Sequence, residues 1–186
     1  MAFQAEIQQV APGDLVFIDE TGVTTSMVRS FARALQGSRA ISRAPAGRYE
    51  RLTLLGAITL NGLLALMTIP AFTNEAIFLA FVDQVLVPEL RAGQVVVLDN
   101  LGAHKRPAIR QAIERAGCRV IFLPRYSPEW NPIEPCWSKM KNFLCSRAAR
   151  TLAALEAAVR DAMDTISAQD ARGWFQHCGY QVAAPD

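Results

Sequence analysis

Three acidic residues of this chain stand where side chains could hold metal ions. Asp19 ends the apolar run that begins at residue 15, Asp99 ends the run that begins at 95, and Glu134 lies at the start of a predicted helix. Carboxylates are the hard oxygen ligands that Mg²⁺ prefers. Three of them could hold two ions a few ångströms apart, an arrangement that catalyses in-line attack on phosphodiesters. These residue types therefore predict an enzyme that cuts and joins DNA.

Each acid also has an ordinary structural explanation. Asp19 and Asp99 could cap turns at the ends of strands, and Glu134 could be placed favourably in the first turn of a helix. Asp99 and Glu134 are separated by 34 residues, and the order along the chain is Asp, Asp, Glu. The combination of order, spacing and context favours a shared metal site over three separate structural roles.

The elements that would position these acids follow from the hydrophobic pattern. The continuous apolar run at 95–99 is expected for a central strand covered on both faces. The other predicted strands are 15–19, 53–60, 63–69 and 119–123. Helices are predicted from a cap at Thr73 or Asn74 to near Pro88, and at 107–116, 133–145 and 152–167. This order predicts an α/β fold with a central mixed five-stranded sheet and helices on both faces.

If strands 15–19 and 95–99 lie parallel and adjacent, Asp19 and Asp99 emerge at the same edge of the sheet. Ligand sites of α/β proteins usually form at such an edge. The helix at 133–145 has an apolar stripe, with Glu134 on a neighbouring face. Glu134 could therefore reach the same cleft while its helix stays docked.

One uncharged segment, 52–74, is long enough to resemble a membrane span. Asn61-Gly62 divides it into two β-rich halves, which is a strong hairpin signal. We therefore predict a buried hairpin and no membrane partner.

Composition fits one folded domain over 1–186, with a core at about 13–168 and an aromatic C-terminal tail, 169–186, that docks back onto it. The chain is 51% hydrophobic and 19% charged, and its net charge is only +2. The segment 21–50 is predicted to be irregular or weakly helical, and mobile without a partner.

Basic residues are concentrated in two stretches that could neutralise phosphates. From 27 to 51 the chain has six arginines and a single acid, Glu50, and a second basic stretch covers 139–150. Either stretch alone could equally be a solvated face. The residues selected as DNA-binding candidates are Arg43, Arg48, Arg125, Lys139 and Lys141.

Residues beside the acids have supporting roles to play. His104 either approaches the scissile phosphate or orders the loop after Asp99, with the structural role the default. Asn100 either fixes Asp99 through a side-chain hydrogen bond or satisfies the end of the strand. Asn131 is expected to shape the turn before Glu134. Trp130 could stack on a base, although packing within the loop is the simpler role, and alternation points Glu20 away from the acids.

The four cysteines form no metal-binding pattern. They stand at 118, 136, 145 and 178, with no C-x-x-C pair, and the two histidines do not complete a zinc site. We expect reduced thiols, mostly in the core of a cytosolic protein. The N-terminus has neither a basic region nor an apolar region of a signal peptide.

At these residues the chain resembles the DDE transposases, in particular the Tc/mariner-like group of bacterial insertion sequences. The matching stretches are 17–21, 97–100 with His104, and 123–134, which reads LPRYSPEWNPIE. The last stretch is the most specific, and the gap of 34 residues matches this group. The resemblance covers roughly residues 13–180.

The resemblance implies a ribonuclease H-like fold in which Asp19, Asp99 and Glu134 are the catalytic, metal-binding triad. It implies Mg²⁺, with Mn²⁺ as a substitute, and hydrolysis at the ends of a mobile element. The freed 3′ hydroxyl would then attack target DNA, commonly at a TA dinucleotide. The implied partners are double-stranded DNA and a second copy of the chain on it, and the implied location is the nucleoid in bacterial cytoplasm.

One departure concerns the N-terminus. Members of this group usually carry helix-turn-helix domains ahead of the first catalytic Asp, but here only 18 residues precede Asp19. We therefore expect the N-terminal DNA-binding domain to be absent from this chain and to be supplied by an upstream reading frame, as a fusion or as a separate chain.

Two other functions are compatible with the same residues. A stand-alone ribonuclease H-like nuclease would cut DNA but never join it. A catalytically silent DNA-binding relic of a transposase would do neither, although an intact set of three acids argues against it.

Overall fold

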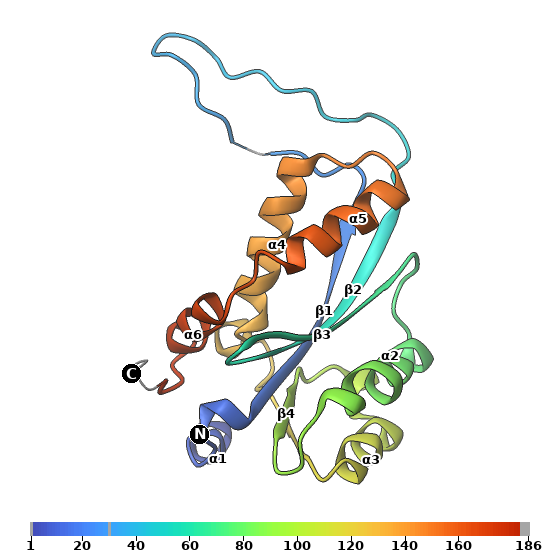
Figure 1. The fold of residues 1–186 in the computed structure, drawn as a ribbon, viewed down its shortest axis with the longest axis vertical. Coiled ribbons are helices and arrows are strands. Elements are labelled where there is room, and N and C mark those ends of the chain that lie inside the picture. Colours follow the sequence, from blue (N-terminus) through green and yellow to red (C-terminus); the bar gives the residue numbers. More distant parts are fainter. Residues whose placement is uncertain (1, 30, 183–186) are drawn as a thin grey trace.

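A mixed five-stranded sheet organises the chain (Figure 1). The computed structural model describes residues 2–29 and 31–182. The strands are β1 (Leu15–Thr24), β2 (Arg51–Thr59), β3 (Gly62–Ile69), β4 (Val95–Leu98) and β5 (Arg119–Phe122), in the spatial order β3-β2-β1-β4-β5. β1 pairs antiparallel with β2 and parallel with β4, and β4 pairs parallel with β5. The predicted sheet is confirmed, including the adjacent parallel strands.

The uncharged segment forms the predicted hairpin. β2 and β3 pair antiparallel across Asn61-Gly62, and Gly62 has a φ of 114°, which a residue with a side chain rarely adopts. β2 is buried along almost its whole length. Within the described ranges, no helix has both the length and the apolar character that crossing a membrane requires.

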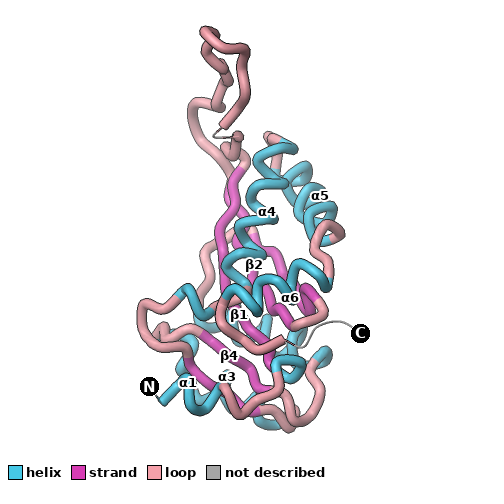
Figure 2. Tube along the Cα trace, turned by 90° about the vertical axis from the view of Figure 1, so that its left-hand side faces the viewer, coloured by secondary structure: helices cyan, strands magenta, loops and turns pink. Residues whose placement is uncertain are grey.

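Helices cover both faces of the sheet (Figures 1 and 2). They are α1 (Ala2–Ile7), α2 (Glu75–Phe81), α3 (Pro107–Arg115), α4 (Ile133–Arg147), α5 (Leu152–Met163) and α6 (Ala168–His177). Side chains alternate along a strand, so β1 contributes Phe17 to the core beneath α4, α5 and α6, and Val16 and Ile18 to the core beneath α2 and α3. Each face therefore has its own buried core.

The C-terminal part differs from the prediction of one helix over 152–167. α5 ends at Met163, and α6 starts after Ser167, whose hydroxyl accepts from the Asp170 N–H while Asp170 accepts from the Ser167 N–H. This reciprocal cap starts a new helix. The aromatic tail docks as expected, because Phe175 and Tyr180 are buried against Phe17.

Two other boundaries differ from the sequence prediction. α1 was not predicted, because six residues are too few to show a helical period. β1 continues to Thr24 instead of ending at Asp19, since its outer half pairs with β2. The cysteines agree with the prediction: all four are free thiols, and Cys118, Cys136 and Cys178 are buried.

Between β1 and β2, residues 31–49 form a long extension without regular structure that reaches away from the sheet (Figure 1). We call residues 31–49 the arginine arm. Every residue of the arm is exposed, including four arginines and the large apolar side chains of Phe31, Leu35 and Ile41. At its base, the Arg150 guanidinium donates to the carbonyls of Thr25 and Met27. The irregular segment is thus as predicted beyond the end of β1.

A glycine in β2 allows the sheet to approach α4. Gly56 is opposite Asp19 in the β1–β2 pairing. A Cβ atom at this position would lie 2.5 Å from Cη2 of the buried Trp137 side chain. That contact is shorter than any real carbon contact, so a larger residue would displace the indole ring.

We predict that Gly56→Ala lowers the free energy of unfolding by about 1–3 kcal/mol, because the buried ring has little room to move. Urea unfolding followed by circular dichroism would measure the loss. Gly22→Ala is the matched control, since its added Cβ meets only the end of the flexible Arg51 side chain. Equal destabilisation by the two substitutions would contradict this account.

Candidate active site

The register of two parallel strands brings two of the acids together. β1 and β4 pair from Leu15–Val95 to Phe17–Val97. Asp19 and Asp99 each lie two residues beyond the last pair, so the same register sets them side by side. Asp99 follows the end of β4, as predicted, but Asp19 lies within β1, because β1 continues along β2 where β4 has stopped. The sheet opens between them.

The third acid comes from the start of α4. The turn Pro128–Trp130 leads into the helix, and the Glu134 N–H donates to the Asn131 carbonyl. The adjoining side of α4 is anchored in the core by residues that include Ile133, Trp137 and Met140. Glu134 is exposed, as expected for an acid that reaches a cleft from a docked helix.

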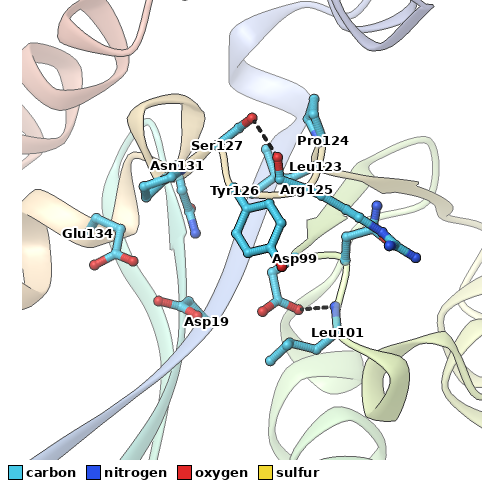
Figure 3. Close-up of a pocket in the computed structure, with 12 residues that line it drawn as sticks. Asp19, Asp99, Leu101, Leu123, Pro124, Arg125, Tyr126, Ser127, Asn131 and Glu134 are labelled. Carbon is cyan, nitrogen blue, oxygen red and sulfur yellow. Dashed lines mark hydrogen bonds between the residues drawn. The ribbon is translucent and has the colours of Figure 1, made fainter.

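The three acids line one cavity of about 380 Å³ (Figure 3). Asp19 lies between Asp99 and Glu134 in this view, with the loop after β5 above them. Asn100, Arg125 and Asn131 line the same cavity. Residues from β1, the end of β4 and α4 therefore converge here, as the sequence predicted.

The charge state of Asp19 is set by its burial. The pKa of the Asp19 carboxyl is raised to about 7, mainly by removal from water, and the nearby charges of Glu134 and Asp99 act in the same direction. Hydrogen bonds from the Glu20 backbone and from Trp137 act in the opposite direction. A cation in the cavity would favour the ionised form of Asp19, so binding of a metal ion there would release a proton from this carboxyl.

Asp99 is held by the loop that follows it. The Leu101 N–H donates to Asp99 Oδ1 at 3.1 Å, and His104 Nδ1 is in direct contact with the same oxygen. His104 is buried, and its ring stacks on Phe78 of α2 with 4.0 Å between the ring centres. His104 therefore orders the loop, and it is not among the described residues that line the cavity.

Two asparagines face the cavity in ways the sequence did not specify. Asn100 does not fix Asp99, because Leu101 and His104 do so; its Oδ1 is buried without a partner among the described residues. Asn131 is 3% exposed, and its Oδ1 is likewise buried without a partner. Its carbonyl shapes the turn before Glu134, as predicted, while its amide points into the cavity (Figure 3).

These residues offer oxygen ligands for a divalent cation. Among the described residues, no three His, Cys, Asp or Glu side chains are close enough together to hold an ion by themselves. Mg²⁺ keeps several waters and shares its coordination with substrate phosphate. Three carboxylates that line one cavity fit such an ion, whose remaining ligands would be water and phosphate.

The basic residues that the sequence predicted to bind DNA lie in different parts of the structure. Arg125 lines it, whereas Arg43 and Arg48 lie in the arginine arm. Lys139 donates to Asp170 at 2.7 Å, and this bond, together with hydrogen bonds from Ser167, lowers the pKa of Asp170 to about 2. Lys141 is half-buried on α4.

Sequence reasoning missed two features of the site. Trp137 was assigned to the core stripe, and it is buried, but its Nε1 also donates to Asp19 Oδ2 at 3.1 Å. Tyr126 lines the cavity with a φ of 57° and is 99% exposed. No local pattern signals either one. Trp130 packs on Phe3, which favours its structural role over base stacking.

A comparison with known families agrees with the family resemblance of the sequence. The family described as "DDE superfamily endonuclease" matches residues 14–156. This match covers most of the chain, and the protein belongs to that family. A search of curated proteins found no match.

Solved structures of one transposase share this fold. A Mos1 transposase paired-end complex with the left transposon end superposes with a TM-score of 0.76 at 16% identity, covering 95% of this chain and 55% of the other. A pre-cleavage Mos1 transpososome gives 0.77 at 14%, covering 95% and 56%. The catalytic domain of Mos1 mariner transposase gives 0.65 at 13%, covering 95% and 82%.

The predicted ribonuclease H-like fold is thereby confirmed. The chain spans about half the length of the Mos1 chains in the complexes and most of the isolated catalytic domain.

We predict that Asp19 makes the metal-free protein less stable as the pH rises. The pKa of Asp19 is about 7 in the folded chain and 3.8 as its ordinary value. Between these values the folded state holds a proton that the unfolded state has lost, so the free energy of unfolding falls by up to roughly 1.4 kcal/mol per pH unit. Above the folded pKa this loss levels off.

Urea unfolding in EDTA from pH 4 to pH 8 would measure this slope. Asp19→Asn should remove it and be more stable than the wild type at pH 8. Asp14→Asn, which changes an exposed acid just before β1, is the control and should follow the wild-type profile. An unchanged slope in Asp19→Asn would refute the assignment.

Proposed function

We propose that this chain is the catalytic domain of a transposase, which cleaves DNA strands at the ends of a mobile element and joins them to target DNA. The observation that carries the proposal is the cavity lined by Asp19, Asp99 and Glu134, in a chain of the DDE superfamily endonuclease family. The Tc/mariner resemblance of the loop 123–134 supports joining as well as cutting.

The three acids would hold divalent cations, and we propose two ions. Bound there, such ions activate the attacking oxygen and stabilise the leaving oxygen. Mos1 paired-end complexes have been solved with Mn and with Mg, which supports divalent metal use by a protein of this fold.

The chain's own residues have definite tasks in this chemistry. Asp19 in its ionised form would be one of the ligands, and Arg125 would offer a positive charge to the DNA phosphate at the cavity. His104 and the Leu101 N–H keep Asp99 in place. The buried Asn131 amide can orient a water or a phosphate oxygen.

Two successive displacements at phosphorus complete the reaction. In the first, water loses a proton and its oxygen bonds to the phosphorus at the element's end, while the bond to the 3′ oxygen breaks and that oxygen takes up a proton. The freed 3′ hydroxyl then loses its proton and bonds to a target phosphorus, and the target's own 3′ oxygen leaves. One cavity can serve both steps, because both place an attacking and a leaving oxygen on opposite sides of a phosphate.

The DNA partner is supported by the charge of the arginine arm as well as by the cavity. The arm carries four arginines and no acid, and all of its residues are exposed. We propose that Arg43 and Arg48 contact DNA phosphates outside the cavity. We propose a second copy of the chain on the DNA, and a helix-turn-helix partner that recognises the element's ends, as its protein partners.

We predict metal-dependent cleavage of labelled DNA by the purified chain in Mg²⁺ or Mn²⁺. Asp99→Ala and Glu134→Gln should lower the rate by on the order of a thousandfold, equivalent to about 4 kcal/mol of transition-state stabilisation. Glu129→Gln is the control, because it changes an exposed acid in the turn that leads to Glu134. Cleavage that survives both substitutions would exclude the proposed site.

Joining separates a transposase from a simple nuclease. The same protein would be given a pre-cut end with a free 3′ hydroxyl, together with an unlabelled target duplex. A transposase forms a longer, covalently joined product. Cleavage without any joined product would favour the stand-alone nuclease.

We predict that Arg43→Gln with Arg48→Gln weakens DNA binding mainly at low salt. Each lost phosphate contact removes about 0.9 from the slope of log affinity against log salt, so the double variant should lose up to about 2. Arg160→Gln, on the exposed side of α5, is the control. Fluorescence anisotropy across a salt series would give the slopes, and identical slopes would remove the arm from the DNA interface.

A further inference from the structure

One buried tryptophan contacts a carboxylate of the proposed metal site from within the core. Trp137 is 2% exposed, and its Nε1 donates to Asp19 Oδ2 at 3.1 Å. Indole N–H is a donor only, and a buried one needs an acceptor. The acceptor here is a carboxylate 118 residues away in sequence, on the central strand β1.

We propose that Trp137 is the positioning residue for Asp19: its indole N–H holds one carboxylate oxygen, so that the rest of the carboxylate faces the cations in the cavity. This inference rests on the proposed function, because it concerns the same three acids. It assigns a task to a side chain that core packing alone would explain.

The sheet is built to admit this ring. Gly56 is the residue opposite Asp19 on β2. A Cβ at position 56 would lie 2.5 Å from Cη2 and 3.1 Å from Cζ2 of Trp137. The six-membered edge of the indole therefore lies against the backbone of β2 while its N–H reaches the neighbouring strand. Any residue larger than glycine at 56 would push the donor away from Asp19.

The position of Trp137 on α4 links two acids. Glu134 and Trp137 are three residues apart, so they lie on adjoining positions of one helix surface. Glu134 faces the cavity directly, and Trp137 acts on Asp19. One helix thus sets the placement of two of the three proposed ligands, and a shift of α4 would move both together.

The hydrogen bond suits the ionised ligand. An ionised carboxylate only accepts hydrogen bonds and has about four acceptor positions. Trp137 occupies one position on Oδ2. Positions remain on both oxygens for a cation, and the direction of the carboxylate is no longer free. Residues that orient a metal ligand in this way usually change metal affinity or activity by 10–100-fold when they are removed.

The test uses Trp137→Phe, which keeps an aromatic ring and lacks the donor. Calorimetric titration with Mn²⁺ in the absence of DNA would measure metal affinity, and unfolding in EDTA would measure stability. We expect the metal dissociation constant to rise by roughly 10–100-fold. Trp174→Phe, a half-buried tryptophan of α6 packed on the same core, is the matched control and should bind Mn²⁺ like the wild type.

A second measurement guards against a merely unstable variant. The chain has three tryptophans, so Trp130→Phe with Trp174→Phe leaves Trp137 as the only indole. Its fluorescence should change on adding Mn²⁺, with the midpoint found by calorimetry, and Asp19→Asn should abolish the change. This readout depends on contact with Asp19 and does not depend on DNA cleavage.

The proposal is overturned if Trp137→Phe binds Mn²⁺ with wild-type affinity, or if saturating Mn²⁺ leaves the single-tryptophan emission unchanged. Failure of the proposed function would look different, because both measurements are made without DNA. A chain that binds Mn²⁺ but neither cuts nor joins DNA would contradict the transposase activity, while a weaker affinity in Trp137→Phe would still support the role of the tryptophan.

Discussion

The site depends on the place where two parallel strands separate. β1 and β4 pair only as far as Phe17 and Val97. Beyond that point β4 ends, while β1 stays paired with β2. The opening leaves Asp19 and Asp99 at equivalent positions without a hydrogen-bonding ladder between them. A longer β4 would close the cavity with backbone, and a register shift of one residue would turn one acid to the opposite face. The geometry of two ligands is thus decided by main-chain hydrogen bonding.

The remaining parts of the site come from opposite sides of the sheet. The core beneath α4 contributes Glu134 directly and supports Asp19 through Trp137. The core beneath α2 supports Asp99, because His104 touches the carboxylate and stacks on Phe78. Burial raises the pKa of Asp19, which lowers the free energy of unfolding at neutral pH. The folded chain keeps this destabilising group because the proposed chemistry uses a charged carboxylate. The buried Oδ1 atoms of Asn100 and Asn131, which have no hydrogen-bond partner among the described residues, also lower the stability of the fold near this cavity.

Much of this could be predicted from sequence because the relevant signals are local. Apolar runs located β1 and β4, Asn61-Gly62 located the hairpin, and the three acids were found by their positions after or beside these elements. Helix α6 was missed, since the prediction ended the last helix at 167 and left 169–186 as an aromatic tail, although Ser167 and Asp170 form a reciprocal cap there. The support of Asp99 went to His104 and not to Asn100, and the Trp137 donor was missed as well. The Trp137 donor depends on a contact between segments 118 residues apart, which no spacing rule encodes, whereas His104 lies five residues from Asp99 and its role in ordering the loop was predicted.

The stacking of His104 on Phe78 has a consequence for how such a site can change over time. Asp99 is held through contacts with α2, whereas Glu134 lies on α4 and Asp19 contacts it. The distances between the three acids therefore depend on how the α2 and α4 layers pack on the sheet. Substitutions that shift only one of these layers would change the distances between the acids, even when the substituted residues lie far from the cavity. Sequences that keep this chemistry are therefore expected to vary in a correlated way at positions under α2 and α4, with compensation running through the sheet.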